Sequence, residues 1–262
     1  MPIGSAAVTP YRRPASARRG AVRSMLLCLP VCALLISACG GAPAASAPAA
    51  TVSPTASSSS TPGRAPGVAY AALGASETFG VGANPVTNGY AYLVRDSLHL
   101  DAAHFADTGI PGTQLGDAYQ TELTNALSIQ PTVCTVFFGA NDIRGGVTLA
   151  QFSRDLDDLV ATLRRANAHV LVIGLPRLEN LPAVRALHIS GIDALVTQWN
   201  ASMQAIAGKQ GAAFLNLDTF TSEIVAHPED IAQDGLHPSN QGHARLAQIV
   251  YAALQQKGYT TA

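Results

Sequence analysis

Ser76 is the first residue whose type and position suggest chemistry. It follows a short apolar run, residues 68–73, which is broken by Gly74. If that run is a buried strand of a parallel sheet, Ser76 lies at the carboxyl edge, where open α/β folds place ligands. A strand followed by a polar turn would explain the same stretch by itself, but the position makes Ser76 a candidate nucleophile.

Three later stretches carry polar groups that a nucleophilic serine needs. They read TGIPGT at 108–113, FGAND at 138–142 and DGLHP at 234–238. A serine hydroxyl is a feeble nucleophile unless an imidazole accepts its proton, and the imidazole needs a carboxylate to fix its tautomer. Asp234 and His237 are three residues apart across a turn, so they can make that contact locally.

Alternating apolar runs and helical patterns predict the elements that bring these stretches together. The predicted strands cover residues 68–73, 102–106, 133–138, 170–175 and 212–217. The predicted helices cover residues 85–98, 115–127, 149–163, 189–207 and 239–256, the last with Ser239 as candidate N-cap. This alternation indicates one parallel sheet covered by helices on both faces.

With these blocks in this order, the chain resembles the SGNH, or GDSL-type, hydrolase family over residues 67–262. The blocks of that family are a Gly-Asp-Ser, a glycine, a Gly-x-Asn-Asp and an Asp-x-x-His, and residues 139–142 and 234–237 match the last two in full. Ala75 stands where the family usually has aspartate, a position outside the triad. The resemblance implies a flavodoxin-like three-layer α/β/α fold with a five-stranded parallel sheet.

The resemblance also implies a serine esterase with no metal or organic cofactor. Ser76 would be the nucleophile, His237 the general base and Asp234 the residue that orients it. The backbone N–H groups of Ser76 and Gly112 and the side-chain amide of Asn141 would form the oxyanion hole. Losing one such donor costs about 10²–10³ in turnover in a comparable hydrolase.

Other residues near the motifs have alternative or purely structural roles. Gly109 is an alternative oxyanion glycine, although the threonine after Gly112 favours the latter. Asp142 is expected to bond loop amides, and His243 is expected to be structural, because helical metal ligands prefer i, i+4 spacing. Cys134 lies in an apolar run, which favours a core position.

The expected substrate is a small-molecule, glycan or lipid ester. The loops expected to line its pocket, residues 77–84, 143–148 and 176–184, are short and mixed in character, which favours short acyl or acetyl esters. Two other functions use the same features: a non-catalytic ligand-binding lipoprotein, and an acyltransferase with the same triad.

The N-terminal part has the design of an export signal. Five arginines precede the apolar run at 25–36, which is too short to cross a membrane comfortably, and Cys39 ends a bacterial lipobox-like ISAC sequence. An ordinary cleaved signal with an incidental cysteine is the alternative. We expect a lipoprotein signal at 1–39, lipidated at Cys39, and a disordered Ala/Ser/Pro/Thr linker at 40–66.

These features predict an extracytoplasmic monomer that is anchored to a bacterial membrane by its lipid, or secreted. Without the five early arginines, 11 basic residues face 17 acidic ones, a net charge of −6, which disfavours nucleic-acid binding. Beyond Cys39 the chain has a single cysteine, so neither a disulfide framework nor a CxxC metal site can form there.

Overall fold

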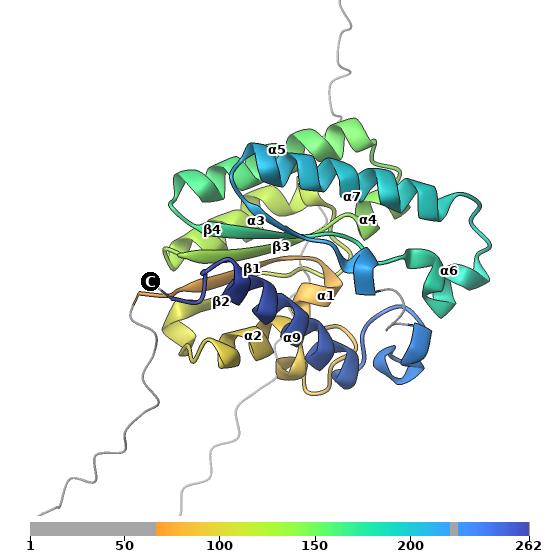
Figure 1. The fold of residues 1–262 in the computed structure, drawn as a ribbon, viewed down its shortest axis with the longest axis horizontal. Coiled ribbons are helices and arrows are strands. Elements are labelled where there is room, and N and C mark those ends of the chain that lie inside the picture. Colours follow the sequence, from red (N-terminus) through yellow and green to blue (C-terminus); the bar gives the residue numbers. More distant parts are fainter. Residues whose placement is uncertain (1–66, 221–224, 262) are drawn as a thin grey trace, which may run out of the picture. The chain divides into compact units, whose positions relative to one another are not determined.

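The structure, a computed structural model, describes residues 67–220 and 225–261. The predicted signal at 1–39, its Cys39 and the predicted linker at 40–66 lie outside the described residues. Figure 1 shows the described part as a sheet with helices packed on its two faces.

Five strands form one parallel sheet in the order β2-β1-β3-β4-β5. The strands are β1 (Tyr70–Gly74), β2 (Phe105–Asp107), β3 (Val133–Phe137), β4 (His169–Ile173) and β5 (Ala213–Leu215). This is the flavodoxin-like order, and it reverses between β1 and β3, where such folds bind their ligands. The predicted fold class is therefore confirmed.

The helices form the two outer layers. One face carries α2 (Tyr90–Ser97) and α9 (Asn240–Gln256), and the other carries α3 (Leu115–Ser128), α5 (Leu149–Arg165) and α7 (Ile192–Lys209), as Figure 1 shows. Three short helices lie between these elements: α1 (Ser76–Phe79), α4 (Ala140–Arg144) and α6 (Pro182–Ala186). The helices α1 and α4 begin directly after β1 and β3, so they start at the carboxyl edge of the sheet.

Local sequence explains the main elements. Every residue of β1 and β3 is buried, as expected for strands covered on both faces. Helix α5 buries an apolar stripe at spacings of three and four, and the Thr148 hydroxyl caps it by accepting the Gln151 amide. Ser239 caps α9 by accepting the Gly242 amide at 3.3 Å, as predicted.

Several predicted elements differ from the observed ones. The helix predicted at 85–98 begins only at Tyr90, after a 3₁₀ turn at Val86–Asn88 and the extended Gly89. The second strand was expected at 102–106, but Ala102–His104 form a 3₁₀ turn and β2 follows at Phe105–Asp107. The Asp101 side chain accepts the Ala103 amide and so favours the turn over an extended strand. The helix predicted at 189–207 begins only at Ile192, after Gly191 in a left-handed conformation, while α6 was not expected.

The described residues offer no helix that is long and apolar enough to cross a membrane. Nor does this part of the chain bring three or more His, Cys, Asp or Glu side chains together as a metal site. The Cys134 thiol is buried in β3, and burial raises its pKa well above the ordinary value. It is a core side chain.

Candidate active site

Ser76 lies where β1 gives way to α1. It is 8% exposed and is the first residue of the helix, so its backbone N–H has no acceptor within the helix. Gly74 makes the tight exit from the strand possible, because a Cβ there would lie 2.7 Å from the Phe137 carbonyl oxygen and 2.1 Å from the Thr78 hydroxyl. The sequence thus places a free amide and a hydroxyl together at the sheet edge.

His237 and Asp234 form a pair within one turn before α9. The His237 Nδ1 lies 2.6 Å from the Asp234 Oδ2, and the Asp234 Oδ1 accepts the amides of Leu236 and His237 at 2.9 and 3.0 Å. Burial raises the pKa of Asp234, but these hydrogen bonds outweigh it and the pKa lies below the ordinary value. The carboxylate is therefore charged at neutral pH and holds the proton of His237 on Nδ1, which leaves Nε2 as the acceptor.

Asn141 follows the sharp turn at the end of β3. That turn uses Gly139, at a φ of 123°, where a Cβ would lie 2.9 Å from Met203. The side-chain amide of Asn141 has no hydrogen-bond partner among the described residues and faces the cavity that Ser76 lines. It is a free donor at that cavity.

Asp142 joins the turn at Asn141 to the start of α3. Its Oδ1 accepts the Leu115 amide at the start of α3 at 3.0 Å, in line with the structural role expected for it. Burial raises the pKa of Asp142 to about 6. The carboxyl thus supports Asn141 from behind and does not face the cavity.

Gly112 and not Gly109 lines the cavity. Gly112 has a φ of 82° and no atom within 4 Å of a Cβ built on it, so its backbone is open to a ligand. A Cβ on Gly109 would lie 2.5 Å from the Phe79 amide nitrogen, which shows that Gly109 packs against α1. The geometry thus favours Gly112 as a donor.

Ser76, Gly112, Asn141 and His237 line a single cavity of about 750 Å³. They come from the ends of β1 and β3, from the loop after β2 and from the turn before α9. The described residues show no hydrogen bond between the Ser76 hydroxyl and His237; the hydroxyl donates instead to the Glu77 Oε2 at 3.2 Å. The sequence-predicted residues are brought together, but the serine and histidine are not yet bonded.

Most of the cavity wall is apolar. The lining side chains beyond the polar group include Ile143, Leu178, Leu181, Val184, Ile192 and Leu236. The three loops predicted to line the pocket all contribute, and the N-terminal part of α7 adds to them. Two arginines, Arg144 and Arg245, also reach the lining.

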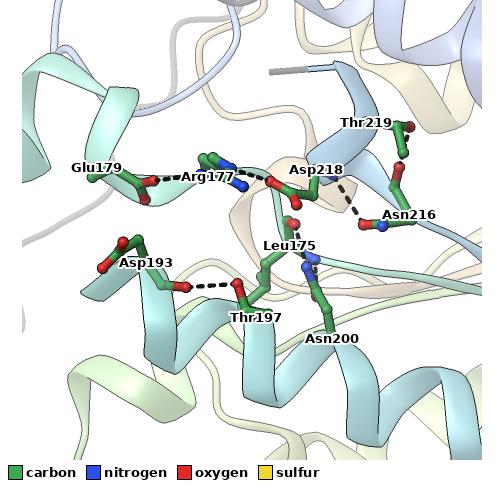
Figure 2. A network of polar contacts seen from close by, with 9 residues as sticks. All are labelled: Leu175, Arg177, Glu179, Asp193, Thr197, Asn200, Asn216, Asp218 and Thr219. Atoms are coloured by element: carbon green, nitrogen blue, oxygen red, sulfur yellow. Dashed lines mark hydrogen bonds and ion pairs between the residues drawn. The ribbon is translucent and has the colours of Figure 1, made fainter. Parts of the chain in front are cut away.

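Polar contacts hold the wall behind β4 in place (Figure 2). Asn200 of α7 accepts the Leu175 amide and donates to the Leu175 carbonyl, both at 2.8 Å, and so fixes the end of β4. Arg177 donates to Asp218 at 2.6 Å and pairs with Glu179 at 3.9 Å, which joins the loop after β4 to the segment after β5. These contacts fix the cavity-lining residues on that side.

His243 joins α9 to the loop after the nucleophile. Its Nδ1 accepts the Tyr90 amide at 3.2 Å, so Nε2 carries the proton and donates to the Val81 carbonyl at 3.0 Å. Burial lowers the pKa of His243, which keeps it neutral. The expected structural role fits this geometry, and no metal-ligand role is needed to explain the residue.

Sequence reasoning missed the parts played by two acids. Glu77 was assigned only to a pocket-lining loop, although an acid directly after a candidate nucleophile is a signal in itself. Glu122, in the middle of α3, is 1% exposed and bonds the Gly74 amide. A charged residue on the apolar face of a predicted helix was the available sign.

Comparison with known proteins identifies the family and the fold. The model of the GDSL-like lipase/acylhydrolase family matches residues 72–245. No curated protein matches the sequence closely enough to count as a relative. The same fold occurs in a catalytic mutant of Axe2, an acetylxylan esterase from Geobacillus stearothermophilus, at a TM-score of 0.59 and 18% identity, over 75% of this chain and 97% of that one.

Two further solved structures are similar. TesA matches at a TM-score of 0.58 and 19% identity over 72% of this chain and 98% of its own. The psychrotrophic esterase EstA from Pseudoalteromonas sp. matches at 0.57 and 19% identity over 72% of this chain and 97% of its own. At these identities the likeness shows a shared fold.

Proposed function

Since the chain belongs to the GDSL-like lipase/acylhydrolase family and is an SGNH serine ester hydrolase, we propose that Ser76, His237 and Asp234 are its catalytic triad. The observation that carries the proposal is the single cavity that Ser76, Gly112, Asn141 and His237 line, with Asp234 bonded to the histidine. Carboxylic ester hydrolysis requires these groups in one place.

The proposed reaction begins when the Ser76 hydroxyl leaves Glu77 and turns to the His237 Nε2. His237 accepts the proton as the Ser76 oxygen attacks the ester carbonyl, and Asp234 stabilises the imidazolium. The amides of Ser76 and Gly112 and the Asn141 side chain donate to the oxyanion. His237 then returns the proton to the leaving alcohol, and water releases the acyl group by the reverse sequence.

The substrate class is a finer part of the proposal. Short acyl or acetyl esters remain the prediction from the loops, and a neighbour described as an acetylxylan esterase supports it. The apolar cavity of about 750 Å³ is one argument against it, because pockets of this size hold ligands far larger than an acetyl group. Small-molecule, glycan and lipid esters all stay within the proposal.

The proposed location follows from the N-terminal sequence. An apolar run after arginines, with Cys39 behind it, supports a lipid-anchored extracytoplasmic enzyme. Mass spectrometry of the cellular protein tests this: a diacylglyceryl group on Cys39 supports the anchor, while a mature chain that begins elsewhere overturns it.

The triad is tested by labelling residues 67–262 with a fluorophosphonate and measuring the intact mass. We expect one adduct, lost in Ser76→Ala and kept in Ser128→Ala, which removes an exposed hydroxyl on α3 as a matched control. An ester panel graded by acyl length is run beside it. Labelling that persists in Ser76→Ala would show that another nucleophile reacts.

The same assays distinguish the alternative functions. A folded protein that gains thermal stability from an ester, yet forms no adduct and releases no acid, would be a ligand-binding protein. If an excess alcohol acceptor is converted to a new ester in preference to free acid, the triad serves acyl transfer.

A further inference from the structure

Glu122 is a buried acid that touches the strand carrying the nucleophile. It lies in the middle of α3, away from the cavity lining, and is 1% exposed. Its Oε2 accepts the Gly74 amide at 2.8 Å. Gly74 is the last residue of β1, two residues before Ser76, so this bond lies directly behind the candidate nucleophile.

The Glu122 carboxyl stands where a strand carbonyl would be expected. On the β2 side of β1, the Thr108 amide donates to the Ala72 carbonyl at 2.9 Å and the Ile110 amide donates to the Gly74 carbonyl at 3.1 Å. In a regular parallel ladder the Gly74 amide would in turn donate to a carbonyl of the β2 segment. Glu122 supplies that acceptor instead, between the two segments that lead to Ser76 and to Gly112.

Burying the Glu122 carboxyl costs free energy, which a backbone carbonyl in the same place would not. Burial raises the pKa of Glu122 to about 8, the Gly74 hydrogen bond lowers it, and the charge of Asp107 on β2 raises it further. The Thr108 hydroxyl, which donates to the Ala72 carbonyl at 3.0 Å, also interacts with the Glu122 carboxyl and lowers its pKa. The second oxygen, Oε1, has no hydrogen-bond partner in the described part of the chain.

Within residues 67–220 and 225–261, Glu122 makes the only side-chain hydrogen bond to the backbone of residues 73–75. Ala75, the residue before α1, makes no side-chain cap, and it is itself buried. The Gly74 amide would otherwise be an unpaired buried donor at the point where the chain turns toward the cavity. Glu122 therefore holds this turn from the α3 layer, together with the backbone bond from Ile110 to the Gly74 carbonyl.

We propose that Glu122 is a positioning residue, which holds the Gly74 amide and thereby sets the place of the Ser76 hydroxyl and amide relative to Gly112 and Asn141. It does not touch the substrate. The inference rests on the proposed role of Ser76, and it concerns catalysis because misplacing a reacting group by about 1 Å can lower a rate about 10²-fold.

Three variants of the full chain distinguish an effect of Glu122 on the position of Ser76 from an effect on the stability of the fold. Glu122→Gln keeps an acceptor at the same reach, Glu122→Asp keeps the acid but is one methylene too short, and Glu122→Leu removes both acceptor and acid. Asp117→Asn is the matched control, because it removes an exposed acid from the same helix. Each variant is assayed for kcat, KM, the fluorophosphonate labelling rate and Tm.

We expect Glu122→Gln and Asp117→Asn to keep kcat within about threefold of wild type. Glu122→Leu and Glu122→Asp should lower kcat and the labelling rate about 10–100-fold with KM nearly unchanged, the extent expected for a misplaced reacting group. Glu122→Leu leaves the Gly74 amide unpaired, which lowers stability, and removes a buried polar group, which offsets part of that cost, so we expect Tm to fall by only a few degrees. Assays run well below Tm then separate a loss of rate from a loss of fold.

Two results would overturn the inference. One is a wild-type labelling rate in folded Glu122→Leu; the other is a fall in kcat that tracks Tm across all variants, with no rescue by glutamine. If wild-type protein itself is not labelled at Ser76, the proposed triad fails first. The two failures are thus told apart.

Discussion

The Ser76 hydroxyl donates to the Glu77 carboxylate at 3.2 Å, while the His237 ring that faces the same cavity is bonded to Asp234 at 2.6 Å. Half of the proposed catalytic unit is therefore assembled before substrate arrives, and the other half is held by a neighbouring acid. In this resting arrangement a rotation of the serine side chain precedes the chemistry.

Removing the Glu77 carboxylate should make Ser76 react faster. A hydrogen bond of this kind stabilises the resting hydroxyl by about 0.5–1.5 kcal/mol, and 1.4 kcal/mol is a factor of ten. We expect Glu77→Ala to raise the fluorophosphonate labelling rate a few-fold, up to about tenfold, and Glu77→Gln, which keeps an acceptor, to stay near wild type. Slower labelling in Glu77→Ala would mean that Glu77 assists the reaction.

Asp234→Asn should separate catalysis from folding. An amide cannot hold the His237 proton on Nδ1 as the carboxylate does, and the equivalent change in a serine protease lowers kcat about 10⁴-fold. The Asp234 side chain is 46% exposed, so water partly replaces it, and we expect a loss of about 10²–10³ in kcat, below the protease value. Tm should shift by only a few degrees.

Stopped assays with a p-nitrophenyl ester and thermal melts measure both effects. The comparison variant is Asp158→Asn, which removes an acid from α5 outside the cavity lining. Activity in Asp234→Asn within threefold of wild type would remove the aspartate from the triad.

Narrowing the apolar cavity should reveal which part of the ester it binds. Burying one methylene contributes about 0.8 kcal/mol, so an acyl chain lying in the cavity gains up to roughly fourfold in kcat/KM per methylene. We expect Val184→Trp, which fills the cavity from α6, to lower kcat/KM for octanoate esters at least about tenfold through lost burial, and for acetate esters little.

The control for Val184→Trp is Val86→Trp, which enlarges an exposed side chain outside the cavity lining. If the wild-type kcat/KM instead falls with each methylene added to the acyl chain, the predicted preference for short acyl groups holds. The apolar wall would then bind the alcohol part of the ester.

His243 predicts an acid limit to stability. Burial lowers the pKa of His243 in the folded protein. Below the unfolded pKa of about 6.5, the unfolded chain therefore binds more protons than the folded one, and the free energy of unfolding decreases as the pH decreases. Protonation at Nδ1 also removes the acceptor for the Tyr90 amide. We expect Tm to fall as the pH is lowered from about 6.5 toward 5. The size of the fall depends on the difference between the folded and unfolded pKa values of His243.

His243→Gln is the variant that tests the pH effect. Glutamine offers an acceptor and a donor but does not titrate, so Tm should be a few degrees lower at pH 7 and less dependent on pH between 7 and 5. An unchanged slope of Tm against pH would assign the acid sensitivity to another group.

The sheet and the cavity-lining blocks were predictable because their causes are local. The apolar runs of β1 and β3 and the stripe of α5 carry their periodicity in neighbouring residues. The pairing of Asp234 with His237 spans a single turn, so it too could be expected. Parallel strands end at one edge, which is why loops distant in sequence meet there.

What sequence could not show depends on contacts between distant segments. Glu122 reaches Gly74 across 48 positions. The charged residue on the apolar face of α3 indicates a buried acid, but nothing near it identifies Gly74 as its partner. The size of the cavity depends on how α6 and α7 pack over the end of β4, with Asn200 holding Leu175. The start of β2 was misplaced because the Asp101 side chain favours a 3₁₀ turn over an extended strand.

The pairing of Asp234 with His237 lies far along the chain from Ser76. During synthesis the serine leaves the ribosome long before its proposed base is made, so a nascent chain carries a nucleophile that nothing activates. A chain cut by a protease before residue 234 is in the same condition, however much of the sheet survives. If Ser76, Asp234 and His237 act as proposed, such truncated chains would hydrolyse no acyl ester, and esterase activity would require the chain through His237.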